Sequence, residues 1–249
     1  TLYSEATLQP EIVSRWLSQD PLAAKYPNMS PYNFVGNMPI VAIDPEGKDI
    51  YLVIWATSDG NIGHAGIAVT NYKTIEQYGP NGEYGGTITV PDGTVTYYDL
   101  WPGNEEGVGM FNASSDVEAL YNEKITTLDK IIDSDITGAE GRAPDGVIKL
   151  VTDYETDHET KKALNSFREE NSSYNGVECN CSDYAESGIE AAAGKQLNVN
   201  EDILKMYNST TPNKLYKETK KLPNAEVLKD AGEKVNNTFT EGVKETGGN

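Results

Sequence analysis

Apolar and polar positions alternate in short segments through the middle of the chain, a pattern that is typical of β-strands. Residues 50–55 are β-branched and aromatic on both faces, which predicts a buried strand. Four further segments have strand character: residues 64–70, 87–90, 94–100 and 146–151. The turn signal Pro91-Asp92-Gly93 predicts that the second and third of these form a hairpin.

Helical spacing of apolar residues predicts four helices beside these strands. Ser115-x-x-Glu118 is a capping box, and apolar residues follow it at intervals of three and four over residues 117–132. Three more helices are expected: from Thr156 or Asp157 to about residue 170, from Cys181 to about residue 193, and from Thr211 onward. Together the two patterns predict an α+β fold in which an antiparallel sheet packs with helices.

Composition divides the chain into three parts. Residues 1–47 are rich in Pro and Asn turn signals, and residues 48–221 contain the predicted strands and helices. Residues 222–249 are rich in Lys, Glu, Asn and Gly, so we expect a polar tail that is mobile or marginally helical.

The charge narrows the classes of partner. The chain has 39 acidic and 20 basic residues, a net charge of -19. This charge argues against binding to nucleic acid or to anionic membrane surfaces, and it favours a basic partner. No apolar run reaches the roughly 20 residues of a membrane-spanning helix, and the first residues lack a signal-peptide pattern. We therefore expect no stable membrane insertion.

The two cysteines, Cys179 and Cys181, are separated by one residue. A disulfide across one intervening residue is strained. The two cysteines could form a zinc site with His64 and His158, but one intervening residue is fewer than the two to four that usually separate paired zinc ligands. The sequence therefore predicts a free thiol and neither a metal nor a cofactor.

Cys181 is the strongest candidate for a catalytic residue. It stands at a predicted helix start, where unpaired amide groups favour a thiolate and can stabilise an oxyanion. The polar residues Asn175, Glu178 and Asn180 predict a solvent-facing approach to that helix. We expect Cys181 to be a nucleophile and Cys179 a bystander; a buried structural cysteine is the alternative for Cys181.

His64 is the candidate general base. Strand alternation places His64 on one face with Gly66 and Ala68, two small residues that let a helix or substrate approach the backbone. A structural histidine is the alternative. The other histidine, His158, lies among acidic residues at a helix start and is expected on a solvated surface.

Asp99 is the candidate third residue, because a carboxylate at the end of an otherwise apolar strand could orient the imidazole. A turn cap before Pro102 is an equally good interpretation of Asp99. Glu76 and Gln77 are the fallback candidates for the orienting role.

Three ordered motifs in residues 14–47 resemble the end of the Rhs/YD-repeat core: RWLSQDP at 15–21, PYNFVGNMPI at 31–40 and DPEG at 44–47. The resemblance implies a parent chain whose repeats form a β-cage, followed by a variable toxin domain. It also implies delivery into neighbouring bacterial cells, for example by type VI secretion, and a cognate immunity protein, which should present a basic contact surface to this acidic chain. Asp20 and Asp44 match the family's self-cleavage positions, whereas Lys48 replaces the usual Leu; self-cleavage and a simple turn both stay open.

A second resemblance covers residues 49–215. Gly63-His64-Ala65-Gly66 on a strand, then Tyr174, then Asn180-Cys181 at a helix start resemble circularly permuted papain-fold enzymes. These are the relatives of NlpC-type peptidases and of the lecithin:retinol acyltransferase group, in which the histidine precedes the cysteine. The resemblance implies that Cys181 is the nucleophile, His64 the general base and Asp99 the orienting residue.

These observations predict a secreted antibacterial toxin that acts as a Cys-His hydrolase on an amide bond. Peptidoglycan amidase or peptidase and protease or deamidase activities are all open, because a fold does not determine the substrate. A lipid acyltransferase or phospholipase on the same fold, and a toxin domain that only binds its target, are the alternatives.

Overall fold

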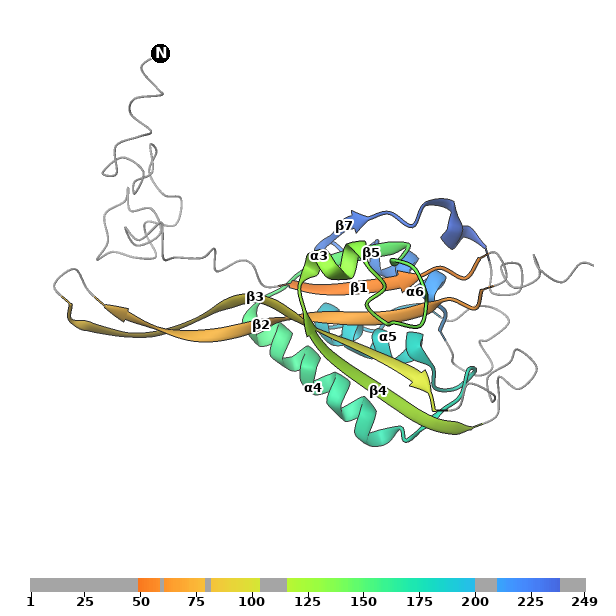
Figure 1. The fold of residues 1–249 in the computed structure, drawn as a ribbon, viewed down its shortest axis with the longest axis horizontal. Coiled ribbons are helices and arrows are strands. Elements are labelled where there is room, and N and C mark those ends of the chain that lie inside the picture. Colours follow the sequence, from red (N-terminus) through yellow and green to blue (C-terminus); the bar gives the residue numbers. More distant parts are fainter. Residues whose placement is uncertain (1–48, 59–60, 79–81, 104–115, 200–209, 238–249) are drawn as a thin grey trace, which may run out of the picture. The chain divides into compact units, whose positions relative to one another are not determined.

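The computed structural model describes residues 49–58, 61–78, 82–103, 116–199 and 210–237 (Figure 1). The chain forms two compact units: Thr1–Gly47 with Ile75–Val90, and Lys48–Thr74 with Pro91–Asn249. The three Rhs-like motifs and Lys48 lie outside the described residues. The first domain boundary and self-cleavage near Asp44 therefore stay predictions.

An antiparallel sheet organises the second unit and confirms the predicted α+β class. Its described strands follow one another across the sheet in the order β6 (Ser173–Tyr174), β4 (Val117–Thr126), β3 (Tyr84–Pro102), β2 (His64–Tyr78), β1 (Asp49–Trp55), β5 (Gly146–Val151) and β7 (Ala225–Lys229). The strands predicted at 50–55, 64–70 and 146–151 are β1, the first half of β2, and β5.

Strand β1, between β2 and β5, is buried along its whole length and separates two hydrophobic clusters. Ile50 and Leu52 belong to one cluster, and Tyr51 and Val53 to the other. This alternation follows from the two-residue period of a strand, and apolar residues on both faces are what a strand covered on both sides requires.

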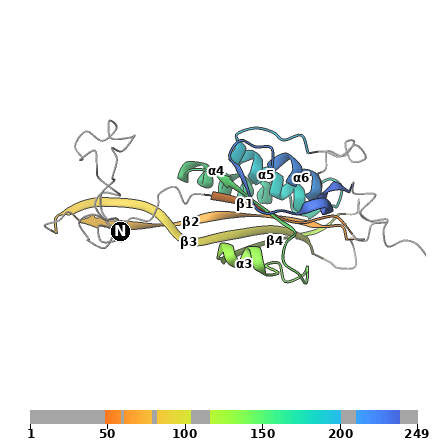
Figure 2. The same cartoon turned by 90° about the horizontal axis from the view of Figure 1, so that it is seen from above.

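Helices cover both faces of the sheet (Figure 2). Helices α4 (Tyr154–Glu170), α5 (Cys181–Ala193) and α6 (Pro212–Thr219) lie on one face, and the short α3 (Leu128–Asp133) lies on the other. The predicted bounds of α5 are confirmed, and Gly194 ends this helix in the left-handed conformation, with φ 62°. Helix α6 starts after its cap Thr211, as predicted.

Helix α4 begins slightly earlier than expected. Asp153 is its N-cap and accepts a hydrogen bond from the Thr156 amide (2.7 Å). Asp157, an expected cap, is instead buried and accepts hydrogen bonds from the hydroxyl groups of Tyr72 and Thr152. Because the Asp157 carboxylate binds these two hydroxyl groups, it does not cap the helix, and Asp153 takes that role.

The hairpin predicted at Pro91-Asp92-Gly93 is wrong, because these residues lie inside β3. Asp92 Oδ1 accepts hydrogen bonds from the Thr94 amide (2.8 Å) and hydroxyl (2.7 Å), and Gly93 has φ 89°, so the motif makes a local irregularity in the strand. Strand β4 begins to pair with β3 at Val95. Pro91 therefore removes no donor from that ladder.

The helix predicted over residues 117–132 is also wrong. Residues 117–126 form β4, and only Leu128–Asp133 is helical. Val117 and Tyr121 point inward and Leu120 is exposed, as strand alternation requires. Eight backbone partners on β3, from Val95 to Pro102, outweigh the helical spacing of the side chains. Ser115, the expected cap, lies outside the described residues.

The polar tail predicted from residue 222 differs from the structure as far as residue 237. Strand β7 pairs with β5, and the 3-10 helix η4 (Gly232–Asn236) follows it. Leu222, Ala231 and Val235 are buried in the hydrophobic cluster beneath the helices. Three well-spaced apolar residues suffice to fix a segment whose average composition is polar.

In the first unit, the described residues are 75–78 and 82–90, which include the outer parts of β2 and β3. The rings of Tyr78 and Tyr84 pack edge to face at 5.9 Å, and both are exposed.

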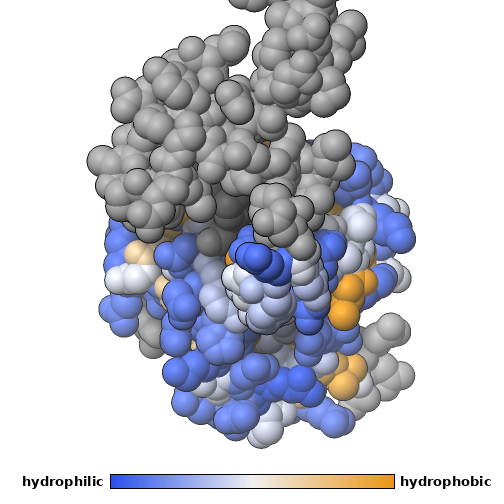
Figure 3. Space-filling view, turned by 90° about the vertical axis from the view of Figure 1, so that its left-hand side faces the viewer, coloured by the Kyte–Doolittle hydropathy of each residue, from blue (hydrophilic) through white to orange (hydrophobic). Residues whose placement is uncertain are grey.

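The described surface in Figure 3 is mostly hydrophilic, and its apolar side chains lie in small separate patches. None of the described helices is long and apolar enough to cross a membrane.

Candidate active site

Cys181 is the first residue of α5, and a capping box holds the start of this helix. Asn180 Oδ1 accepts hydrogen bonds from the amides of Ser182 (2.7 Å) and Asp183 (3.2 Å), and Asp183 Oδ2 accepts one from the Asn180 amide (2.9 Å). Among the described residues, the Cys181 amide has no hydrogen-bond partner. The cap thus occupies the amides of Ser182 and Asp183 and does not use the Cys181 N–H.

Of the three residues expected to face solvent before α5, Glu178 is exposed, whereas Asn175 and Asn180 are buried. Asn175 and Asn180 are 4% and 6% exposed. The Asn175 amide donates to the Cys179 carbonyl (2.7 Å), the Cys179 amide donates to the Asn175 carbonyl (2.9 Å), and Asn175 Oδ1 accepts from the Val177 amide (2.9 Å). The asparagines face inward because their side chains satisfy the backbone groups of a closed turn.

His64 is the first residue of β2 and pairs in register with Trp55, the last residue of β1. The imidazole is buried between two indole rings: Trp101 stacks on it with ring centroids 4.1 Å apart, and Trp55 lies at 5.6 Å. These walls restrict rotation of the His64 ring and exclude water from its faces.

Asp99 faces His64 from β3, with 3.4 Å between Nε2 and Oδ2. This is an ion-pair distance without a hydrogen bond of normal geometry. Two other groups hold the carboxylate. The Trp101 indole N–H donates to Oδ2 (2.8 Å), and the side-chain amide of Asn122 donates to Oδ1 (2.9 Å). Asp99 is therefore fixed from the sheet itself, in the position that an orienting carboxylate needs.

The charge on His64 results from opposing effects. Burial disfavours the imidazolium, but the neighbouring Cys181 sulfur and the Asp99 carboxylate outweigh it and raise the pKa of His64 from 6.5 to about 10. The structure therefore brings Cys181, His64 and Asp99 together and favours a positive imidazole between a thiol and a carboxylate.

Tyr174 is the other side chain beside Cys181. Strand β6, which contains Tyr174, pairs with β4, so the sheet positions this tyrosine independently of α5. Burial first, and then Cys181, raise the pKa of Tyr174 well above its usual value. Its neutral hydroxyl can donate a hydrogen bond to the sulfur.

The sequence did not indicate Trp101 or Asn122 as parts of this site. Trp101 lies two residues after Asp99 on the same face of β3, so strand alternation alone could have placed it. Asn122 opposes Asp99 only through the register of β3 with β4, a segment expected to be helical. No local pattern could have found it.

The remaining candidates lie elsewhere. Cys179 packs in the hydrophobic cluster, and burial, then Asp183 and Asp116, raise its pKa to about 12. His158 is exposed on α4 and stacks on Tyr154. Within the described ranges no three His, Cys, Asp or Glu side chains gather as a metal site would require.

The fallback orienting residues are not beside His64. Glu76 accepts a hydrogen bond from the Tyr78 hydroxyl (2.5 Å), and Gln77 lies next to it in the outer part of β2.

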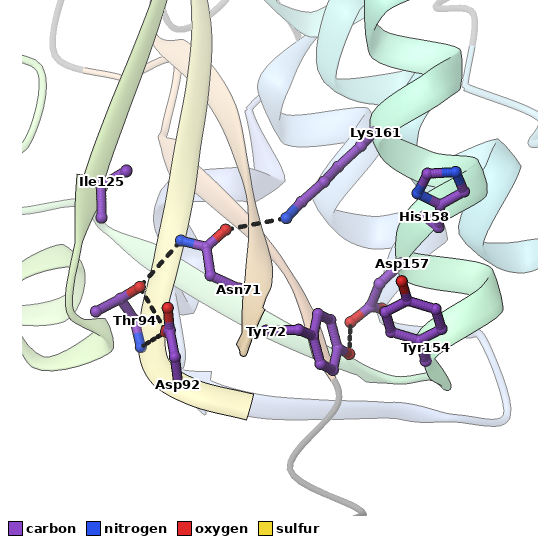
Figure 4. A pocket seen from close by; sticks show the side chains of 9 residues that line it. All are labelled: Asn71, Tyr72, Asp92, Thr94, Ile125, Tyr154, Asp157, His158 and Lys161. Atoms are coloured by element: carbon purple, nitrogen blue, oxygen red, sulfur yellow. Dashed lines mark hydrogen bonds between the residues drawn. The ribbon is translucent and has the colours of Figure 1, made fainter. Parts of the chain in front are cut away.

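A cavity of about 500 Å³ opens between α4 and strands β2 and β3 (Figure 4). Asn71 and Lys161 meet at its wall, where Lys161 Nζ donates to Asn71 Oδ1 (2.9 Å). Asn71 lies seven residues beyond His64 on β2, roughly 23 Å away along a strand. None of the three candidate catalytic residues lines this cavity, so the cavity and the candidate site are separate features.

Comparisons with known proteins add no relative to these findings. No family model matches the chain, and neither a curated protein nor a solved structure matches it.

Proposed function

We propose that this protein is a cysteine hydrolase in which Cys181 attacks an amide carbonyl and His64 transfers the protons. The observation that carries the proposal is the position of the Cys181 thiol at the start of α5 beside a buried imidazole that a fixed Asp99 faces. These are the nucleophile, base and orienting group of cysteine hydrolases.

The first half of the reaction forms a thioester. The Cys181 thiolate adds to the carbonyl carbon, and the carbonyl π electrons move to oxygen, where the Cys181 N–H can donate a hydrogen bond. Because Asp99 faces Nε2, Nδ1 is the nitrogen that exchanges a proton with the sulfur side. The imidazolium gives that proton to the amide nitrogen, the C–N bond breaks, and the amine leaves.

The second half hydrolyses the thioester. Neutral His64 takes a proton from water, the hydroxide adds to the thioester carbon, and the C–S bond breaks to release a carboxylic acid and the thiolate. The imidazolium and thiolate are then restored. No redox partner is needed, because no atom changes its oxidation state.

The order of elements supports a circularly permuted papain-like arrangement. The strand bearing His64 precedes the helix bearing Cys181. Side chains of α5 and β1 share one hydrophobic cluster, so α5 packs against the sheet. Delivery as an Rhs-type toxin, with an immunity protein that binds through a basic surface, is supported by the motifs in residues 14–47 and by the net charge of -19. Association with such a partner should slow as salt concentration rises.

Thiol alkylation tests the hydrolase proposal. Iodoacetamide should modify Cys181 faster than a model thiol at neutral pH, because the proposed reaction requires an activated nucleophile. Cys179 should react slowly, because burial and two acids hold its pKa near 12. Cys179→Ala is therefore the matched control for Cys181→Ala.

Toxicity on expression separates the outcomes. Cys181→Ala should abolish toxicity and Cys179→Ala should retain it. Full toxicity of Cys181→Ala, together with ordinary Cys181 reactivity, would exclude catalysis and leave target binding. Toxicity only with an added export signal would indicate a cell-wall amide, and toxicity only in the cytosol would indicate a protein amide.

A further inference from the structure

Trp101 contacts both His64 and Asp99, and the two contacts use different parts of its indole ring. The ring stacks on the His64 imidazole, with centroids 4.1 Å apart and an angle of 22° between the planes. Its N–H donates to Asp99 Oδ2 (2.8 Å). Trp101 and Asp99 are two residues apart on β3, so their side chains lie on the same face of the strand. One side chain therefore restrains the plane of the imidazole and the position of the carboxylate together.

The oxygen atom that Trp101 binds is the one that faces His64. Asp99 Oδ2 lies 2.8 Å from the indole nitrogen and 3.4 Å from His64 Nε2. A charged N–H group and a carboxylate that form a hydrogen bond are usually about 2.7–2.9 Å apart, so the longer distance is that of an ion pair alone. Among the described residues, the buried Nε2 of His64 has no hydrogen-bond partner. The ring that stacks on His64 thus also binds the oxygen that is nearest to its Nε2.

The other oxygen atom of Asp99 is also bound, which limits rotation of the carboxylate toward His64. The side-chain amide of Asn122 donates to Oδ1 (2.9 Å) from β4, where Asn122 pairs in register with Asp99. Asp99 is 1% exposed, so water has little access to replace either donor. Two donors, one on each oxygen, therefore determine how closely Asp99 approaches His64.

We propose that Trp101 is a positioning residue that holds Asp99 at ion-pair distance from His64 by binding the carboxylate oxygen that faces the imidazole. This inference rests on the proposed hydrolase function. At that distance the carboxylate favours the imidazolium through its charge, and it does not accept the proton on Nε2. His64 then retains the proton on Nε2 and exchanges only the one on Nδ1, as both halves of the proposed reaction require.

Trp55 provides a matched control, because it flanks the same imidazole and its N–H binds a different residue. Its ring centroid lies 5.6 Å from that of His64, and its N–H donates to the Arg142 carbonyl (2.9 Å). Trp55→Phe therefore removes an indole N–H and part of an aromatic wall beside His64, but leaves Asp99 bound to Trp101. A change that occurs in Trp101→Phe and not in Trp55→Phe is then due to the hydrogen bond with Asp99.

The test measures the contact between His64 and Asp99 in Trp101→Phe, by NMR and by a crystal structure at pH 7. Burial lowers the pKa of His64, but Cys181 and Asp99 together raise it to about 10, so the ring carries both protons at this pH. Loss of the indole N–H should let Asp99 Oδ2 bind Nε2, and the distance between them should fall from 3.4 Å to about 2.8 Å. The resonance of the Nε2 proton should move downfield, and this proton should exchange more slowly with water.

Two further variants separate the hydrogen bond from the shape of the ring. Replacement of Trp101 by 3-benzothienylalanine exchanges the N–H for a sulfur atom and keeps the ring size, so it should give the same downfield shift with the stack preserved, even if Trp101→Phe fails to fold. Asn122→Ala frees only Oδ1, so the Nε2 resonance should not move. An unmoved resonance in the folded Trp101 variants, or an equal shift in Trp55→Phe or Asn122→Ala, would overturn the inference.

The result can be distinguished from a failure of the hydrolase proposal. The NMR measurement uses neither a substrate nor the reactivity of Cys181, and the chain has two histidines, so the exposed His158 is an internal reference for His64. An unreactive Cys181 together with a shifted His64 resonance would overturn the hydrolase and leave the effect of Trp101 on Asp99. A reactive Cys181 together with an unmoved His64 resonance would overturn only the role of Trp101.

Discussion

His64 is the residue in which burial and charge compete most directly. Its imidazole is enclosed by Trp55 and Trp101, an environment that alone would favour the neutral ring. The charged form is nevertheless favoured, because Cys181 and Asp99 both face the ring. The same contacts that serve the proposed chemistry therefore also affect the stability of the fold.

The pH dependence of unfolding should show this coupling. The folded pKa of His64 is raised from 6.5 to about 10, so its stabilising contribution is complete below pH 6.5 and is lost as pH rises through 10. One bound proton gives a slope of at most about 1.4 kcal/mol per pH unit. Urea denaturation of His64→Gln between pH 6.5 and 10 should show a flatter profile than the unaltered chain.

The difference between the two profiles is the informative quantity. Glu186, whose pKa burial raises to about 8, titrates in the same window in both proteins and cancels in the comparison. Parallel profiles would mean that His64 is neutral in the folded protein, against the charge pattern described above.

Helix α5 is the element on which the candidate site most depends. Its start is fixed by a cap that comes from the turn before it, and the cap also fixes where Cys181 lies. Asn180 supplies both halves of this arrangement: its side chain accepts from Ser182 and Asp183, and its amide donates to Asp183.

Asn180→Ala should destabilise the fold by about 1–2 kcal/mol and slow alkylation of Cys181, because the first turn of α5 loses its cap. The matched control is Asp153→Ala, which removes the cap of α4. That variant should cost a similar free energy and leave the alkylation rate unchanged. Equal slowing in both would mean that general destabilisation, and not the position of the cysteine, controls reactivity.

Helices and strands could be predicted from the sequence where local sequence signals and tertiary packing favour the same structure. The bounds of α5 could be predicted because Asn180 is a typical residue at the start of a helix and Gly194 a typical residue at its end. Strand β4 could not, because its residues have helical spacing and only the partners on β3 make them a strand. Pro91 misled in the same way, since its place beyond the β4 ladder depends on tertiary structure.

The candidate residues themselves show the same division. Cys181, His64 and Asp99 could be proposed because thiols and imidazoles are rare in this chain and a lone carboxylate on an apolar strand is conspicuous. Their shared location depends on how β2, β3 and α5 pack, which no local pattern contains. The role of Asn122 depends on strand register and was therefore outside the reach of the sequence.

Over the second unit as a whole, the chain beyond α6 completes the sheet. Strand β7 covers the edge of β5, and η4 returns Val235 to the core. This segment begins about thirty residues after α5 ends, so the last strand of the sheet comes from a part of the sequence that follows all three candidate catalytic residues.

Val235→Ala should therefore lower the stability of the whole unit by about 1–3 kcal/mol, since it empties space in the core. Glu233→Ala, an exposed change in the same 3-10 helix, should be nearly neutral. Thermal melts of the two variants make the comparison. Equal melting temperatures would show that residues after β7 add nothing to the core.

The stacking of Trp101 on His64 has a practical consequence. A protonated imidazole in contact with an indole ring quenches its fluorescence, and these rings lie 4.1 Å apart. The emission of Trp101 should brighten when His64 loses its proton, without any substrate or label. Trp101 fluorescence would thus report the charge of His64, and it could be followed while candidate substrates are added.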